Sequence, residues 1–232
     1  MIAETGVRSV TVRELAETRR ATTSEDMVAI TFDDGFASAA EVAGSLLLER
    51  GLVATLFCVA GHLGGANNWP SARRDGYQSR LASAAALSEL AADGFEIGSH
   101  GMEHAPLAGA PEPVLRHEVV DSRRALEDAV TAPVTSYAYP YGALPGTLGR
   151  QLVAEAYDAA CTASLRRISE DSDSHALPRI DAHYLRRPEL LKRALEGRLG
   201  VYFRARGLAA RARRSIVKDY AEPKEAESSL SK

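Results

Sequence analysis

The stretch Ile30-Thr31-Phe32-Asp33-Asp34-Gly35 ends a short apolar segment with two adjacent carboxylates and a glycine. The segment 27–32 has the length of a buried strand, and a helical pattern begins just after Gly35. In parallel α/β proteins the carboxyl ends of strands usually carry the chemistry, because the loops there converge on one cleft. Two neighbouring aspartates repel each other unless they share a cation or a proton. The stretch therefore predicts a strand end that carries a metal site.

A second apolar segment, Phe95 to Gly98, is followed by His100 and, four residues later, by His104. On a helical turn this spacing would place both imidazoles on one face, with Cβ atoms about 5–6 Å apart. Two neutral imidazole nitrogens and one carboxylate form a catalytic Zn²⁺ site of the three-ligand type, which leaves positions open for water and substrate. One of the two aspartates would complete this set, and the other would be left over.

Strand and helix signals alternate along most of the chain. We expect helices at 37–50, 83–93, 111–129 and 148–156, and strands at 7–12, 27–32, 53–60, 95–98, 134–139, 157–162 and 176–180. Gly51 and Gly94 are suited to end the first two helices. This order predicts an α/β fold with a parallel sheet, open or closed into a barrel. The segment 61–77 has no periodicity, contains Trp69, and is predicted to be a long loop.

The composition is that of one globular domain: 232 residues, 45% hydrophobic, with a formal net charge of −3. A slightly negative chain gives no argument for a nucleic-acid partner. No apolar run is long enough to span a membrane and no signal-peptide pattern is visible, so the sequence as written predicts a cytoplasmic protein. Cys58 and Cys161 lie in apolar segments and are expected to be buried free thiols.

The segment from Pro188 to Lys218 is predicted to be helical and is strongly basic. A run of charge is usually a solvated helix face, although an anionic membrane surface or an acidic polymer would also suit it as a partner. Residues 222–232 have the polar composition of a frayed tail. We therefore expect a folded domain over 1–207, followed by a basic helix and a polar, disordered tail over 208–232.

Three ordered motifs resemble those of the polysaccharide deacetylases, the carbohydrate esterases with a NodB-homology domain. They are Thr31-Phe32-Asp33-Asp34-Gly35, Ser99-His100 with His104, and Tyr139-Pro140-Tyr141-Gly142. The similarity extends to Ala54-Thr55-Leu56-Phe57, Glu96-Ile97-Gly98, Tyr157-Asp158-Ala159-Ala160 and Leu177-Pro178-Arg179-Ile180. Because it reaches from about residue 7 to about residue 207, the segment 1–207 is expected to be the deacetylase domain.

The resemblance implies a distorted (β/α) barrel and metal-dependent removal of N-acetyl groups from a glycan. Carried over motif by motif, Asp34, His100 and His104 would hold the metal. Asp33 would be the base that deprotonates the attacking water, a division that leaves one carboxylate free to take a proton. Zn²⁺ suits two nitrogens and one oxygen, while Co²⁺, Ni²⁺ or Fe²⁺ could occupy the same geometry.

The resemblance also implies residues around the substrate. The backbone N–H of Tyr141 would help to stabilise the oxyanion of the tetrahedral intermediate, and Tyr139 and Pro140 would aim it and border the substrate. Trp69, in the long loop, would suit a sugar face, although aromatic residues in loops more often serve in packing. The expected partner is an N-acetylated glycan.

The chain departs from the family pattern in two places. Many members carry an arginine just before the Pro-Tyr element, but this chain reads Tyr137-Ala138-Tyr139 there; Arg179 could supply the guanidinium, or form only a surface ion pair. A histidine acid that protonates the leaving amine is also not found where the family carries it. A start codon further upstream, a missing acid and His183 in that role are the three alternatives.

Other interpretations of these residues stay open. His100-Gly101-Met102-Glu103-His104 also spells the His-x-x-Glu-His of inverted zinc proteases, with Glu103 as base, although Gly101 and Pro106 disfavour the long helix that this motif needs. A relative that binds metal or glycan without turnover is a second alternative. An amidase of the same fold acting on a small amide is a third, and two surface histidines beside an unrelated Asp-Asp turn are the last.

Overall fold

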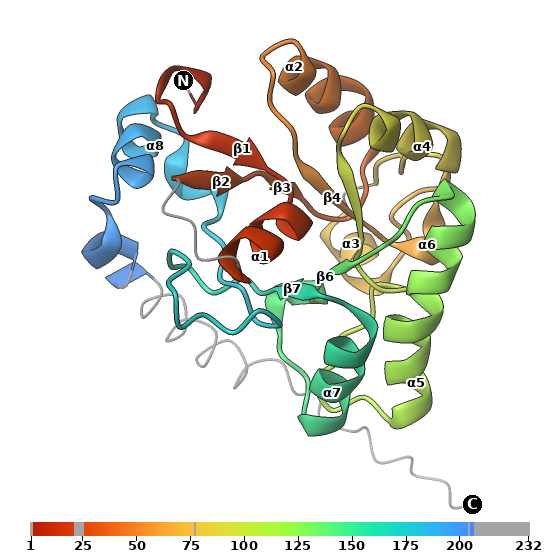
Figure 1. Ribbon diagram of the computed structural model, residues 1–232. Helices are drawn as coiled ribbons and strands as arrows, with labels where there is room; N and C mark the ends of the chain where they lie inside the picture. The colour runs from red at the N-terminus through yellow and green to blue at the C-terminus, as the bar shows by residue number, and fades with distance from the viewer. Residues whose placement is uncertain (1, 21–25, 77, 204, 207–232) are drawn as a thin grey trace, which may run out of the picture.

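A curled parallel sheet forms the centre of the protein, whose computed structural model describes residues 2–20, 26–76, 78–203 and 205–206 (Figure 1). Its five strands run in the order β3-β4-β5-β6-β7, and each neighbouring pair is parallel. They comprise Thr31–Phe32, Thr55–Cys58, Glu96–Ser99, Ser136–Ala138 and Ala159–Cys161. β1 (Arg8–Val10) and β2 (Met27–Ala29) form a second parallel pair. This half-barrel of strands surrounded by helices confirms the predicted α/β class.

Four of the five strands of the larger sheet are buried on both faces, and only β3 is half-buried. Every residue of β4, β5, β6 and β7 is buried, which explains why these segments are continuous apolar or small-residue runs rather than alternating ones. Leu56 and Ile97 from the sheet pack in one cluster with Leu126 and Val153 from the helices. Each such fully buried side chain contributes roughly 1.5–3 kcal/mol to folding.

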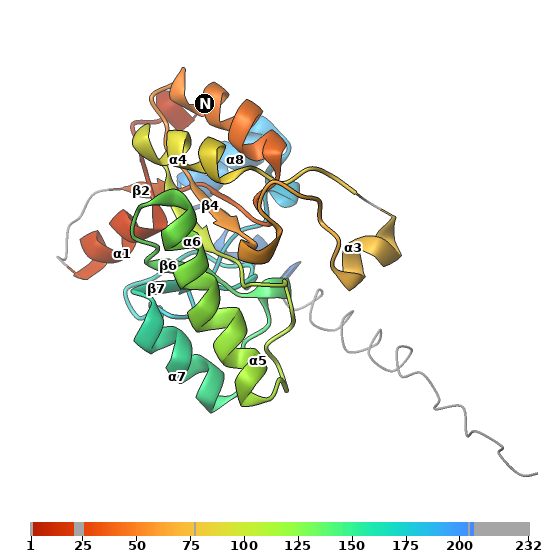
Figure 2. The same cartoon turned by 90° about the vertical axis from the view of Figure 1, so that its right-hand side faces the viewer.

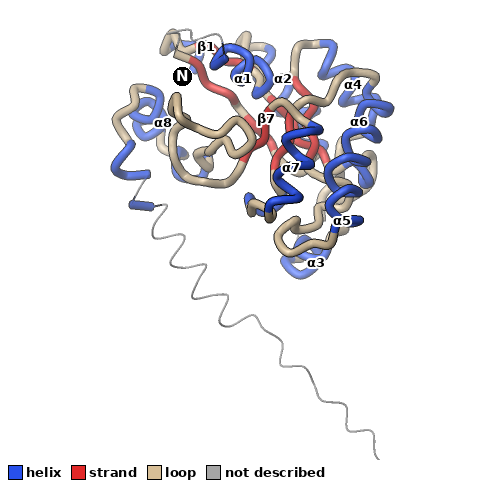
Figure 3. Tube along the Cα trace, turned by 60° about the horizontal axis from the view of Figure 1, so that its bottom comes forward, coloured by secondary structure: helices blue, strands red, loops and turns tan. Residues whose placement is uncertain are grey.

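Helices lie outside the sheet on both of its faces (Figure 3). α1 (Val12–Arg20) packs near β7, while α4 (Ala84–Ala92) and α6 (Ser122–Val130) pack against β5. α4 confirms the helix predicted at 83–93, because the Ser83 side chain caps its first turn and Gly94 ends it at a φ of 94°. α7 (Thr147–Ala156) confirms the helix predicted at 148–156.

Two of the predicted helices contain π-helical turns. The helix predicted at 111–129 consists of α5 (Glu112–Arg116), the π turn η4 (His117–Asp121) and α6. The helix predicted at 37–50 begins with the π turn η2 (Ala39–Ala43) and continues as α2 (Gly44–Leu48). Single π turns are rare and are frequent at functional sites.

The predicted loop 61–77 contains two short helical pieces. They are η3 (Ala60–His62), which follows β4 directly, and α3 (Pro70–Asp75). α3 begins with Pro70 in its first turn and ends at Gly76 in the left-handed conformation, both ordinary helix boundaries. α3 stands apart from the body of the sheet on an outlying arm of the chain (Figure 2).

The end of the chain differs most from the sequence-based expectation. The strand predicted at 176–180 is wrong: within the described residues it makes a single bridge, from Leu177 to Cys161, because Pro178 cannot donate to a ladder. The chain continues through η6 (Ala182–Leu185) and α8 (Pro188–Leu195). Residues 207–232, with the C-terminal part of the predicted basic helix and the whole tail, lie outside the described residues. η1 (Ile2–Glu4) and η5 (Pro140–Gly142) are two further short helical turns, and residues 200–203 and 205–206 are helical as well.

None of the helices in the described ranges combines the length and apolar character needed to cross a bilayer. Cys58 and Cys161 are buried and unpaired, as predicted.

Candidate metal centre and cleft

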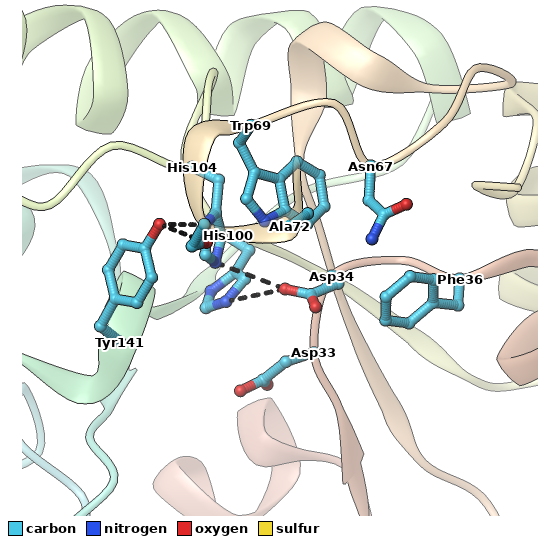
Figure 4. Close-up of a pocket in the computed structure, with 10 residues that line it drawn as sticks. Asp33, Asp34, Phe36, Asn67, Trp69, Ala72, His100, His104 and Tyr141 are labelled. Atoms are coloured by element: carbon cyan, nitrogen blue, oxygen red, sulfur yellow. Dashed lines mark hydrogen bonds and ion pairs between the residues drawn. The ribbon is translucent and has the colours of Figure 1, made fainter. Parts of the chain in front are cut away.

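One carboxylate and two imidazoles meet at the carboxyl edge of the sheet. Asp34, His100 and His104 each offer a ligand atom, and these three atoms lie within 4.8 Å of one another. Nε2 of His100 lies 3.5 Å from Oδ1 of Asp34, and Nε2 of His104 lies 3.4 Å from the same oxygen (Figure 4). Asp34 follows β3 and His100 follows β5, so the parallel sheet itself brings them together.

The loop that carries the second histidine is not the helical turn expected from the spacing. Residues 100–106 contain no helix, and the turn is made by positive φ angles of 89° at Gly101 and 58° at His104. The two imidazoles still approach, with ring centroids 4.9 Å apart. Because the inverted zinc-protease motif needs a long helix here, the structure does not support Glu103 as its base.

Each histidine turns its Nδ1 away from the cluster to a defined partner. Nδ1 of His100 lies 2.7 Å from the backbone carbonyl of Ala138, and since a carbonyl only accepts, this nitrogen carries the proton. Nδ1 of His104 lies 3.2 Å from the phenol oxygen of Tyr141, which is 2.9 Å from Oγ of Ser71. Such outer partners fix the tautomer and the ring orientation of metal-binding histidines.

The electrostatics of the three donors fit a divalent cation. Burial lowers the pKa of His104 to about 3, with the neighbouring His100 acting in the same direction, so its imidazole is neutral as a metal ligand must be. Burial raises the pKa of Asp34, and the adjacent Asp33 carboxylate raises it further while His100 acts against this rise. A carboxylate whose charge is unfavourable on its own is stabilised when a cation binds.

The neighbouring Asp33 has a different partner. Nη1 and Nη2 of Arg179 donate to Oδ1 and Oδ2 of Asp33 at 2.6 and 2.8 Å. Burial acts to raise the pKa of Asp33, but His100 and the Arg179 guanidinium outweigh it, and the pKa lies below its usual value. The guanidinium that holds Asp33 thus comes from a segment distant in sequence.

Two aromatic rings enclose His104. The indole of Trp69 stacks on its imidazole with centroids 4.6 Å apart and planes at 29°, and the Tyr141 ring meets it edge-on at 4.7 Å. Trp69 is only 4% exposed and also packs against Val59, Ala72 and Leu81. One indole face is therefore occupied by His104, which leaves less of the ring for a sugar than the sequence-based prediction assumed.

The three candidate donors line a cleft of about 340 Å³. Residues that line it are Asp33, Asp34, Phe36, Asn67, Trp69, Ser71, Ala72, His100, His104 and Tyr141. Phe36, Asn67, Ser71 and Ala72 were not predicted. They lie in loops and on α3, where no spacing rule tells which side chains face inward.

Four residues proposed from the sequence are not among those that line the cleft, and one of them is Arg179, which instead contacts Asp33. Tyr139 is 1% exposed, and its hydroxyl donates to the carbonyl of His175 at 2.9 Å, so it serves in the core rather than on a substrate-facing wall. Pro140 is buried at the start of η5. His183 is exposed on η6, where the side chain of Asp181 caps its backbone N–H at 2.8 Å. The structure does not bring His183 to the donors.

Fold and donor cluster together define a parallel α/β protein with a candidate metal centre at the carboxyl ends of its strands. The family model for polysaccharide deacetylases matches residues 20–160. Since this match covers more than half of the chain, the protein belongs to the polysaccharide deacetylase family.

Individual relatives support the same placement. YxkH of Bacillus subtilis (strain 168), whose name assigns it to the polysaccharide deacetylases, is 25% identical over 179 residues, which cover 76% of this chain and 60% of YxkH. The chain thus spans about 60% of the length of this curated relative.

Solved structures share the fold at lower identity. The deacetylase PplD of Streptococcus pyogenes, in complex with acetate, superposes with a TM-score of 0.66 at 21% identity, covering 77% of this chain and 75% of PplD. IcaB from Ammonifex degensii gives a TM-score of 0.62 at 21% identity, covering 77% and 78%. The BpsB deacetylase domain from Bordetella bronchiseptica gives 0.62 at 18% identity, covering 77% and 80%. These likenesses confirm the predicted fold.

Proposed function

We propose that this protein is a metal-dependent hydrolase that removes N-acetyl groups from an N-acetylated carbohydrate. The observation that carries the proposal is the pairing of two different carboxylates at one strand end: Asp34 faces two imidazoles, while Asp33 faces a guanidinium. Membership of the deacetylase family supports an amide on a carbohydrate as the bond that is cleaved.

Asp34, His100 and His104 would hold the divalent cation, with Zn²⁺ best matched to two nitrogens and one oxygen and with Co²⁺, Ni²⁺ or Fe²⁺ able to take the same donors. When bound, the cation supplies Lewis acidity, which polarises the amide carbonyl and makes water a better nucleophile at neutral pH.

Asp33 is the base in this proposal. Its lowered pKa keeps the carboxylate ionised at neutral pH, so that an oxygen is ready to accept the proton of the attacking water. Arg179 holds both of its oxygens in place through the paired hydrogen bonds. A base that is held rigidly at the cleft needs little reorganisation when the proton moves.

Tyr141 would contribute through its backbone. It lies on the turn after β6 with a φ of 60°, a conformation that a non-glycine residue rarely adopts and that often marks a functional site. Its N–H would donate to the oxyanion of the tetrahedral intermediate, as fixed backbone donors do in other acyl-transfer sites. Collapse of the intermediate gives acetate and a free amine.

The leaving amine needs a proton, and here an observation favours a second candidate. Among the described residues, the histidines that line the cleft are His100 and His104, the two metal-ligand candidates. If the chain carries no other acid, it would be a relative that binds metal or glycan without turnover. The two candidates differ in one measurable quantity, the release of acetate.

Metal content and acetate release, measured together, test the proposal. The purified full-length protein and its Asp33→Asn and Asp34→Asn variants would be loaded with Zn²⁺, desalted, analysed for bound metal and incubated with N-acetylglucosamine oligomers. We expect wild type to hold one metal and release acetate, Asp33→Asn to hold the metal without releasing acetate, and Asp34→Asn to lose both.

Other outcomes separate the alternatives. A wild-type protein that holds metal but releases no acetate from any N-acetylated glycan would support the binding-only candidate. Release of ammonia or another amine from small amides, without activity on glycans, would favour the amidase. A wild-type protein that binds no metal after loading would contradict the whole proposal.

A further inference from the structure

A buried carboxylate lies directly behind the loop that carries His104. Glu118 is 1% exposed and belongs to the π turn η4. Its oxygens accept hydrogen bonds from the backbone N–H groups of Met102 at 3.0 Å, of Glu103 at 3.0 and 3.3 Å, and of Ala105 at 3.3 Å. The carboxylate therefore holds three N–H groups of a five-residue loop whose fourth residue is a candidate metal ligand.

The loop is shaped around this carboxylate. A Cβ at Gly101 would lie 2.4 Å from Oε2 of Glu118, so the close approach of backbone to carboxylate requires a glycine there. The N–H of Gly101 turns instead to Oγ of Ser99, which pairs with Oγ of Ser122 at 2.9 Å. Burial raises the pKa of Glu118, while the N–H donors of Glu103, Ala105 and Met102 each favour its ionised form.

The hydrogen bonds from the loop 101–105 to Glu118 explain a strained backbone conformation at the site. His104 has a φ of 58°, a left-handed conformation that is strained for a residue with a Cβ atom. With Met102, Glu103 and Ala105 bound to one acceptor, the chain on both sides of His104 is fixed, and the left-handed angle follows. Without this acceptor, the three N–H groups would have to find water or other partners.

We propose that Glu118 is a positioning residue for the metal centre: it sets the conformation of the loop 101–105 and thereby directs Nε2 of His104 toward Asp34. This inference rests on the proposed role of His104 as a metal ligand. Glu118 touches none of the three donor side chains in the described hydrogen bonds, so its effect on the metal would pass through the loop backbone. Outer groups that orient a ligand typically change metal affinity by about 10- to 100-fold.

Glu118→Gln is the informative substitution. It keeps the volume of the side chain but replaces one acceptor oxygen with an NH₂ group, which cannot accept from the loop. We expect the loop to relax and the Co²⁺ affinity to fall by about 10- to 100-fold. The visible absorption of bound Co²⁺, which reports ligand geometry, should change in position or intensity.

The chain offers a matched control in Glu96. It is 2% exposed on the same strand that leads to His100, and its Oε2 accepts from the backbone N–H of Arg13 at 2.9 Å and from the Thr55 hydroxyl at 2.8 Å. Glu96→Gln therefore disturbs a buried carboxylate with a backbone donor at the opposite end of the strand. It should lower the stability of the protein but leave Co²⁺ affinity and spectrum unchanged.

The experiment compares full-length wild type, Glu118→Gln and Glu96→Gln by three measurements: Co²⁺ affinity from competition with a chromogenic chelator, the Co²⁺ absorption spectrum, and urea unfolding of the metal-free protein. Weaker affinity and an altered spectrum in Glu118→Gln alone support the inference. An equal loss of Co²⁺ affinity in both variants, or no loss of affinity in a folded Glu118→Gln protein, would overturn the inference. Neither result would contradict the proposed metal site itself. If wild type binds no Co²⁺, the proposed metal site and this inference are both wrong.

Should Glu118→Gln fail to fold, Glu118→Asp gives the second test. It keeps both acceptor oxygens but withdraws them by one methylene, so the loop can follow only in part. We expect an intermediate loss of Co²⁺ affinity, and an affinity equal to wild type would overturn the inference.

Discussion

Arg179 and Asp33 form a bidentate ion pair although they lie 146 positions apart in the sequence, with N···O distances of 2.6 and 2.8 Å. The same guanidinium donates to the hydroxyl of Thr31 at 3.2 Å and to the carbonyl of Thr162 at 3.1 Å. It is thus held both by Thr31 in β3 and by Thr162, the residue after β7. An arginine with this many acceptors has little freedom, which makes it a positioning group for Asp33 rather than a mobile surface charge.

Arg179→Lys should therefore impair the chemical step more than substrate binding. A lysine keeps the charge but replaces the planar guanidinium with a single ammonium group. That group cannot bind both carboxylate oxygens in the same way, so Asp33 loses its fixed orientation. Since a positioned base contributes about 10²–10⁴-fold, we expect kcat for acetate release to fall by about 10- to 100-fold, with KM within about twofold of wild type. Arg150→Lys, at the exposed ion pair with Asp173, is the control. An unchanged kcat in a folded, metal-loaded Arg179→Lys protein would contradict this role.

Tyr141→Phe tests the side chain of Tyr141 separately from its backbone. The substitution removes the phenol that contacts Nδ1 of His104 and Oγ of Ser71 but keeps the ring against the imidazole and the backbone N–H in place. We expect metal affinity to fall by about 10-fold, because an outer partner of a ligand is lost. Ser71→Ala, which leaves the contact between Tyr141 and His104, should weaken it less. Equal affinities in all three proteins would show that the hydroxyl does not orient His104.

The sequence located the candidate metal donors but not their surroundings. Asp33, Asp34, His100 and His104 follow apolar strand segments, so the parallel sheet brings them to one edge as the sequence predicted, whereas their division into metal ligands and base came only from the resemblance and stays a prediction. The Arg179 contact could be suspected only from the resemblance, since its segment is no regular strand. Glu118 and Ser71 could not be found, because they reach the site through helix and loop packing that leaves no short-range pattern.

Trp69 should report metal binding through its fluorescence. It is the only tryptophan in the chain, and its indole lies 4.6 Å from the His104 ring. An open-shell ion such as Co²⁺ quenches an excited indole at this short range, so emission should fall in proportion to occupancy. His104→Ala should abolish the quenching at low Co²⁺, whereas His117→Ala, on an exposed histidine, should retain it. Quenching that survives in His104→Ala would place the ion elsewhere.

The fold was predictable where the hydrophobic pattern of one kind of secondary structure dominates a segment. The buried strands and α4 were located correctly, since continuous apolar runs and an N-cap serine are local signals. The π turns η2 and η4 were not, because one extra residue per turn leaves the apolar pattern almost unchanged. α3 was missed since its six residues have no apolar period, and its ends are marked only by Pro70 and Gly76.

Thr131→Gly should stabilise the protein without touching the cleft. Thr131 is exposed just after α6 and adopts a left-handed φ of 53°. Of the four non-glycine residues with positive φ in the described ranges, the other three, Asp34, His104 and Tyr141, line the cleft. A glycine pays no Cβ penalty there, so we expect the free energy of unfolding to rise by about 0.5–1 kcal/mol in urea. Metal affinity should be unchanged, and a loss of stability would mean that the threonine side chain contributes more than its strain costs.

The two thiols should make the protein sensitive to alkaline pH. Burial raises the pKa of Cys58 and of Cys161 from 9.0 to about 12 each. A group whose pKa is higher in the folded than in the unfolded protein contributes stability that is complete below pH 9 and is lost as the pH rises toward 12. Ionisation of each thiol in the unfolded protein should lower the free energy of unfolding by up to about 1.4 kcal/mol per pH unit in that window. The buried tyrosines, which are half ionised at pH 10 when unfolded, contribute to the decline in the same way in wild type and in Cys161→Ala, so the comparison of the two isolates the thiol. Urea unfolding at pH 8, 9 and 10 should therefore show a decline that is shallower in Cys161→Ala. A decline of equal slope in wild type and variant would mean that Cys161 is accessible to solvent in the folded protein.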